Sequence, residues 1–137
     1  AAPTLIKPNI DELQELVDSH LKTNVDVIQA AQQWLDNGIQ TVVVSMGAEG
    51  ALFVESNEAV LAQPPRVTVK STVGAGDAMV SGTVAGKTKG ATLADCARLA
   101  TAFSLSAVTN VGSGLPSLEA IETFKSQITV KNLEPIK

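Results

Sequence analysis

The feature that most constrains the fold is the stretch QTVVVSM at residues 40–46, an almost unbroken run of β-branched and apolar side chains. A strand with one face in water alternates apolar and polar residues, whereas a continuous apolar run is typical of a strand that is covered on both faces. Helices are the usual cover on each face of such a sheet. Residues 40–46 therefore predict a central strand in a layered α/β fold.

Apolar and amphipathic segments alternate along the rest of the chain, which favours a largely parallel sheet flanked by helices. We expect further strands over residues 4–7, 51–56, 58–63, 66–71 and 127–133. We expect helices over residues 10–20, 24–37, 77–89 and 92–110, and one more after residue 117. Within residues 77–89, Gly82 and Gly86 form a G-x-x-x-G pair, which we interpret as a site of close helix packing.

Composition and charge exclude several classes of partner. The chain has 137 residues, 45% of them hydrophobic, which suits one globular domain. Its formal net charge is −4 and its ten Lys and Arg residues are scattered, which argues against a nucleic-acid or anionic-membrane partner. No apolar run approaches the roughly 18 residues of a membrane span. The single cysteine, Cys96, cannot form an internal disulfide, so we expect a reducing, cytoplasmic location.

The stretch VKSTVGAGDAMVSG, residues 69–82, places a small-residue turn before an expected helix. It is not a Walker A loop, since no lysine follows the glycines, and it is not the G-x-G-x-x-G dinucleotide motif, since Met79 follows. Without bulky side chains, the backbone N–H groups of residues 74–77 can converge at a helix N-terminus. That arrangement suits the charge on a transferring phosphoryl group.

Asp77 ends this turn, where a negative charge would repel a phosphate. It makes chemical sense as a general base that takes a proton from an attacking hydroxyl, while the N–H groups hold the phosphoryl oxygens. The alternative is structural, because aspartate is a favoured residue at helix N-termini. The turn alone does not decide between these interpretations.

Two other turns also follow expected strands. SMGAEG, residues 45–50, comes directly after the central strand, at the edge where open α/β sheets bind ligands, although it also fits an ordinary hairpin turn. KPNIDE, residues 7–12, places Asn9 and Glu12 at the spacing of a capping box. In a functional interpretation, Glu12 acts through water on a Mg²⁺ ion held mainly by phosphates, and Lys7 adds a positive charge.

The segments KPNIDEL, VVVSMGAEGALFV and PPRVTVKSTVGAGDAMVSG resemble, in this order and spacing, the ribokinase-like sugar kinases, and within them the phosphosugar branch. The resemblance covers nearly all of the chain but only the C-terminal part of the family's fold. It implies that residues 1–137 form the half that binds the nucleotide and carries the catalytic base, without the N-terminal half and the lid. It also implies that the isolated chain is inactive.

By that resemblance, Asp77 is the catalytic base, and the backbone of Gly74, Ala75 and Gly76 forms an anion hole for the γ-phosphoryl group. The residues expected to border the nucleotide are Ser45, Gly47, Ala48, Glu49, Gly50, Gly76, Asp77 and Asn110. Asn9 and Glu12 match the family's N-x-x-E element, which is linked with Lys7 to magnesium and phosphate. No metal site built from protein ligands alone is expected.

The resemblance implies ATP and Mg²⁺ as partners, a phosphorylated ketohexose as acceptor and a homodimer at full length. Fructose 1-phosphate is the expected acceptor, with fructose 6-phosphate and tagatose 6-phosphate as alternatives. A nucleotide-binding module without chemistry and a structural domain whose turns are only turns remain as alternatives of other classes.

Overall fold

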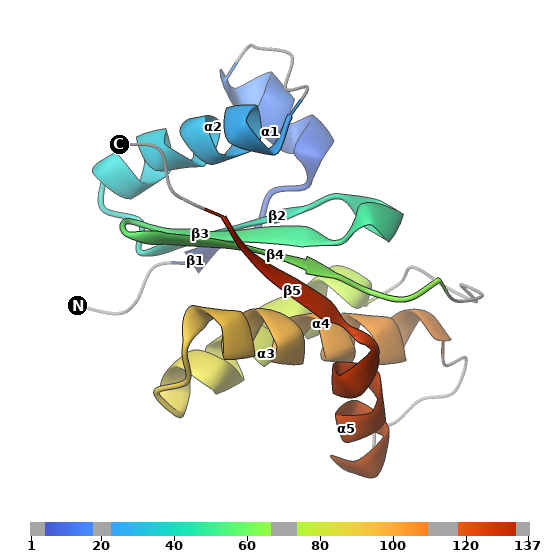
Figure 1. The fold of residues 1–137 in the computed structure, drawn as a ribbon. Coiled ribbons are helices and arrows are strands. Elements are labelled where there is room, and N and C mark those ends of the chain that lie inside the picture. Colours follow the sequence, from blue (N-terminus) through green and yellow to red (C-terminus); the bar gives the residue numbers. More distant parts are fainter. Residues whose placement is uncertain (1–4, 18–22, 67–73, 110–117, 134–137) are drawn as a thin grey trace.

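The computed structural model describes residues 5–17, 23–66, 74–109 and 118–133 (Figure 1). Within these ranges the strands are β1 (Leu5–Ile6), β2 (Thr41–Ser45), β3 (Ala51–Glu55), β4 (Glu58–Gln63) and β5 (Thr129–Leu133). The helices are α1 (Ile10–Val17), α2 (Asn24–Asp36), the short 3₁₀ turn η1 (Gly47–Glu49), α3 (Ala75–Thr88), α4 (Leu93–Thr109) and α5 (Leu118–Gln127). The expected strand at residues 66–71 lies almost wholly outside the described residues.

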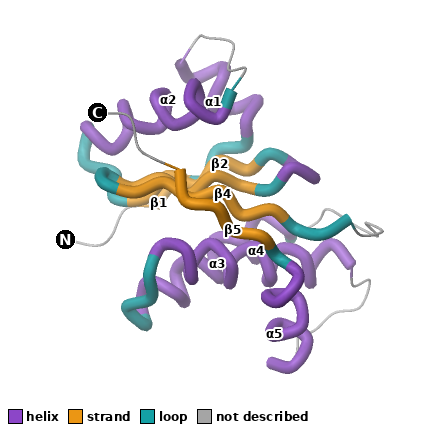
Figure 2. The backbone as a smooth tube through the Cα atoms, in the orientation of Figure 1, coloured by secondary structure: helices purple, strands orange, loops and turns teal. Residues whose placement is uncertain are grey.

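The five strands form one sheet in the order β1-β2-β3-β4-β5. Helices α1 and α2 lie on one side of it, and α3, α4 and α5 lie on the other (Figure 2). The expected α/β layering is therefore confirmed. Residues 40–46 contribute β2, whose four residues from Thr41 to Val44 are all buried, as expected for a strand covered on both faces.

The expectation of a largely parallel sheet is wrong for the described strands. Only β1 and β2 pair in parallel, and the other three pairings are antiparallel. For the β2–β3 and β3–β4 pairings the physical reason is the length of the connections. Five residues join β2 to β3 and two join β3 to β4, whereas a parallel neighbour requires a crossover of about a dozen residues or more. As a result β1, β2 and β4 run in one direction and β3 and β5 in the other.

Each face of the sheet carries its own core. Alternate residues of β2 point to opposite sides, so that Val42 and Val44 pack with α1 and α2, whereas Val43 packs with α4 and α5. Leu13 and Ile28 belong to the first core and are almost inaccessible to solvent. The second core is rich in alanine, which lets the helices approach the sheet closely.

The helix starts follow local signals in the sequence. Asn9 and Glu12 form a reciprocal capping box at α1: the Asn9 N–H donates to Glu12 Oε1 at 2.9 Å and the Glu12 N–H to Asn9 Oδ1 at 2.8 Å. At α4 the Asp95 N–H donates to Thr92 Oγ1 at 3.1 Å. The expected close packing in α3 is also present, because a Cβ at Gly82 would lie 2.6 Å from the Ala100 Cα of α4.

Candidate functional site

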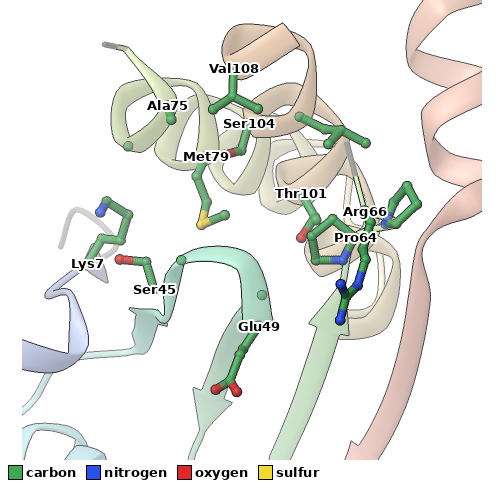
Figure 3. A pocket seen from close by; sticks show the side chains of 15 residues that line it. Lys7, Ser45, Glu49, Pro64, Arg66, Ala75, Met79, Thr101, Ser104 and Val108 are labelled. Atoms are coloured by element: carbon green, nitrogen blue, oxygen red, sulfur yellow. The ribbon is translucent and has the colours of Figure 1, made fainter. Parts of the chain in front are cut away.

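A cavity of about 740 Å³ opens at the carboxyl ends of β1, β2 and β4, the three strands that share a direction (Figure 3). It lies between these strand ends and helices α3 and α4. Its lining residues are Lys7, Ser45, Gly47, Glu49, Gly50, Pro64, Pro65, Arg66, Ala75, Gly76, Met79, Thr101, Ser104, Leu105 and Val108. All three turns that the sequence analysis singled out thus contribute to one cavity.

Lys7 brings a positive charge to one end of this cavity. It follows β1, and its side chain reaches the first turn of α3, where a Cβ at Gly76 would lie 3.2 Å from both Lys7 Cε and Lys7 Nζ. The β1 and β2 ends are held together by the bond from the Ser45 N–H to the Pro8 carbonyl at 3.1 Å. The ammonium group, the end of β2 and the start of α3 are therefore neighbours.

The first turn of α3 supplies the backbone donors. Gly74 caps the helix in the left-handed region with φ of 83°, a conformation that glycine adopts without strain. The first intrahelical bond runs from the Ala78 N–H to the Gly74 carbonyl at 2.9 Å. The N–H groups of the residues between them have no intrahelical acceptor by the geometry of an α-helix. With the helix dipole and Lys7, they make this end of the cavity attractive to an anion.

The turn after β2 is both a hairpin connection and part of the cavity wall. Gly50 N–H donates to the Gly47 carbonyl at 3.1 Å, and Met46 N–H to the Gly50 carbonyl at 2.8 Å, which closes the η1 turn. Gly50 has φ of 103°, and a Cβ there would overlap the carbonyl oxygen of Ala62 in β4. Only glycine allows the turn to pass so close to β4.

Several expected site residues are not among those that line the cavity. Asp77 is exposed at the third position of α3, one residue beyond Gly76. Asn9 and Glu12 are exposed and bond each other in the α1 cap. Gly74 and Ala48 lie in turns that contribute neighbouring residues to the lining. Asn110 lies outside the described residues.

For the opposite wall the sequence analysis named only Asn110, at the end of the helix expected over residues 92–110, and none of its residues that line the cavity. This wall consists of one face of α4, and Met79 of α3 extends between the two walls in Figure 3. The α4 residues are Thr101, Ser104, Leu105 and Val108. Their spacing of three, four and seven residues is that of a single helix face, and the two hydroxyl groups on this otherwise apolar face were the signal that could have identified it.

Cys96 lies outside the cavity and is buried. Burial raises the pKa of the Cys96 thiol, although the nearby Lys87 ammonium opposes the shift. A buried, protonated thiol is a poor nucleophile. The described part of the chain contains no group of three or more His, Cys, Asp or Glu side chains that could hold a metal ion.

A three-layer α/β fold with a glycine-capped helix start and a lysine at its strand ends is typical of α/β proteins that bind phosphate groups. Residues 1–121 match the sequence pattern of the pfkB family carbohydrate kinases. The chain belongs to the pfkB family of carbohydrate kinases.

The relatives support this assignment in sequence and in structure. The chain is 46% identical over 136 residues to the 1-phosphofructokinase of Rhodobacter capsulatus. This match covers 99% of the present chain but only 43% of the Rhodobacter protein. Escherichia coli phosphofructokinase-2, solved in complex with substrates and products, has a TM-score of 0.82 at 37% identity, over 90% of this chain and 40% of that one. Thermotoga maritima ribokinase has a TM-score of 0.74 at 26% identity, and the match covers 89% of this chain and 42% of the ribokinase.

These comparisons confirm the ribokinase-like fold. They also show that the chain spans less than half the length of the relatives it matches. None of the helices described is long and apolar enough to span a membrane.

Proposed function

We propose that this chain provides the nucleotide site and the catalytic base for phosphoryl transfer from ATP to a phosphorylated ketohexose. The observation that carries the proposal is the single cavity to which Lys7, the turn at residues 45–50 and the start of α3 all contribute. The phosphates would bind at the Lys7 end, against the first turn of α3. The ribose would lie along the turn at residues 45–50.

Asp77 would act as the general base at the mouth of this site. Its carboxylate would accept the proton of the acceptor hydroxyl while that oxygen forms a bond to the γ-phosphorus. The bond between the γ-phosphorus and the bridging oxygen would break, and ADP would leave with the electron pair. The N–H groups beside Gly76 would hold the phosphoryl oxygens on which charge accumulates.

The residues near the cavity fit a Mg²⁺ ion that is held through phosphates rather than through protein ligands. The carboxylates there, Glu12, Glu49 and Asp77, are exposed and come from three separate turns. Mg²⁺ retains several waters in such sites. When bound, it would neutralise charge on the β- and γ-phosphates. Glu12 would contact its water shell, and Lys7 would supply the permanent charge beside it.

Fructose 1-phosphate is the acceptor that we propose, supported by the 46% identity to a 1-phosphofructokinase. Fructose 6-phosphate and tagatose 6-phosphate remain alternatives. We propose that most of the acceptor site lies in the part of the relatives that this chain does not match, that the isolated chain does not turn over, and that the full-length protein is a cytoplasmic homodimer. A nucleotide-binding module without chemistry is favoured only by the exposed position of Asp77 outside the lining.

A calorimetric titration of this chain with Mg-ATP tests the proposal. We expect saturable binding, and at least about ten-fold weaker binding in Gly76→Val, because the new side chain would occupy the space of Lys7 Nζ. Ser81→Val is the matched control: it adds the same side chain at an exposed position of α3 outside the cavity and should bind like the native chain. Absent binding in the folded native chain, or equal binding in both variants, would overturn the proposal.

A further inference from the structure

Helix α3 packs chiefly against α4, and the two helices lie side by side on one side of the sheet (Figure 1). Their contact is very close at two glycines of α3. A Cβ at Gly82 would lie 2.6 Å from Ala100 Cα, and one at Gly86 would lie 2.7 Å from Cys96 Sγ. The first turn of α3, with Gly76, lies N-terminal to these contacts. A helix held in this way can tilt about its contact, so the position of its ends depends on what ties them to the sheet.

The C-terminal end of α3 is tied to the sheet by an ion pair. Lys87 Nζ lies 2.6 Å from Oε2 of Glu55, the last residue of β3. Thr41 Oγ1, in β2, donates to the same carboxylate oxygen at 2.6 Å, and Thr41 is buried. Because this bond already holds the carboxylate, the ion pair loses less side-chain entropy than exposed pairs usually do. Lys87 thus connects α3 to two strands of the sheet.

We propose that Lys87 and Glu55 are positioning residues for the phosphate end of the cavity, because their ion pair holds α3 at the tilt that brings its first turn to Lys7. This inference rests on the proposed function. Gly76 lies six residues before Gly82 and Lys87 five residues after it, which gives arms of about 9 and 7.5 Å. A displacement at Lys87 would therefore move the N–H groups of the first turn by a similar distance. Donors to a phosphoryl group must be placed within about 0.5 Å.

Position, rather than charge at the cavity, explains how this pair would act. Lys87 lies eleven residues from Gly76 along α3, or about 16 Å, which is about twice the Debye length at physiological ionic strength. The partners also carry opposite charges, so their removal changes the net charge in opposite directions. A long-range field would make Lys87→Met weaken and Glu55→Gln strengthen the binding of an anion. Loss of position would make both variants weaken it.

The test compares Lys87→Met and Glu55→Gln in this chain by calorimetric titration with Mg-ATP at physiological salt. We expect each to weaken binding about three-fold, within the range of a partly exposed ion pair, and the double variant to lose no more than either single variant. Lys87→Arg keeps the pair and should bind like the native chain. Lys89→Met is the matched control, because it removes the same charge two residues along the chain, and Lys89 has no ion pair within the described residues.

Thermal unfolding without ligand provides a second readout, because a purely structural pair would lower the midpoint and leave the affinity of the folded chain unchanged. Lys125→Met breaks the exposed pair with Glu122 in α5, outside the cavity, and should leave the affinity unchanged. Native affinity in either Lys87→Met or Glu55→Gln, opposite changes in the two, or an equal loss in Lys125→Met would overturn this inference and leave the proposed function intact. Absent Mg-ATP binding in the native chain would overturn both.

Discussion

Asp77 occupies the third position of α3, where a carboxylate has two uses. There it interacts favourably with the helix dipole, a contribution of about 0.3–1 kcal/mol at an exposed site. In the proposed function its carboxylate, one residue beyond Gly76, accepts the proton of the acceptor hydroxyl. Asp95 has the same position in α4, away from the cavity, and so the chain contains its own control.

We expect Asp77→Asn to abolish turnover in a protein that also carries the acceptor half, while Mg-ATP affinity in this chain stays within a few-fold. The reason is that a base acts in the transition state rather than in nucleotide binding. Steady-state kinetics and calorimetry measure the two quantities. Asp95→Asn should leave turnover intact, although both variants lose a similar, small amount of stability. Loss of ATP binding together with turnover in a folded Asp77→Asn protein would make Asp77 a structural residue.

Single site residues could be predicted where a charged residue accompanies a glycine-rich turn in the sequence. The GAGD turn and Lys7 follow from a rare combination of small residues and charge, and the structure places Lys7 and Gly76 against each other. Thr101 and Met79 were not predictable in the same way. In the sequence, a helix face that lines the cavity resembles one that packs in the core. Which of the two it is depends on the strand ends that lie opposite, and these are distant in the sequence.

At the scale of elements, the connection lengths indicate the direction of β3 and β4, although the alternation of helices and strands along the chain favours a parallel sheet. The short turns at residues 46–50 and 56–57 leave room only for hairpins. The course of β5 could not be read in this way. It pairs with β4 as an antiparallel neighbour after the described helices α3, α4 and α5, an arrangement that depends on packing against α4.

The close approach of the β2–β3 turn to β4 can be tested by substituting its glycine. Gly50 and Gly38 have φ of 103° and 100°, but a Cβ at Gly50 would meet Ala62, whereas one at Gly38 would meet nothing within 4 Å. We expect Gly38→Ala to lower the free energy of unfolding by about 1–2 kcal/mol, the cost of the backbone conformation alone. Gly50→Ala should lose roughly 3 kcal/mol or more, because overlap with β4 adds to that cost.

Urea denaturation of both variants, with fixed slope, measures the difference. Equal losses would mean that the turn relaxes away from β4 without penalty. In that case the close approach of Gly50 to Ala62 would not fix the position of the turn in the cavity wall.

For the whole molecule, the proposed function requires a chain with a net charge of −4 to attract a polyanion. Charges farther away than the Debye length, about 8 Å at physiological ionic strength, are largely screened. The local field of Lys7 and the α3 N-terminus should therefore dominate. Lys89 caps the other end of α3; fourteen residues at 1.5 Å each place it about 20 Å from that N-terminus.

We accordingly expect Lys7→Met to weaken Mg-ATP binding about ten-fold and to reduce its dependence on salt, since a direct charge-assisted contact is lost. Lys89→Met changes the net charge by the same amount and should weaken binding less than about two-fold. Titrations at low and physiological salt measure both effects. Equal losses in the two variants would show that net charge sets the affinity and would remove Lys7 from the nucleotide site. Unequal losses in the expected order would locate the attraction at the strand ends, where the fold brings Lys7 to Gly76.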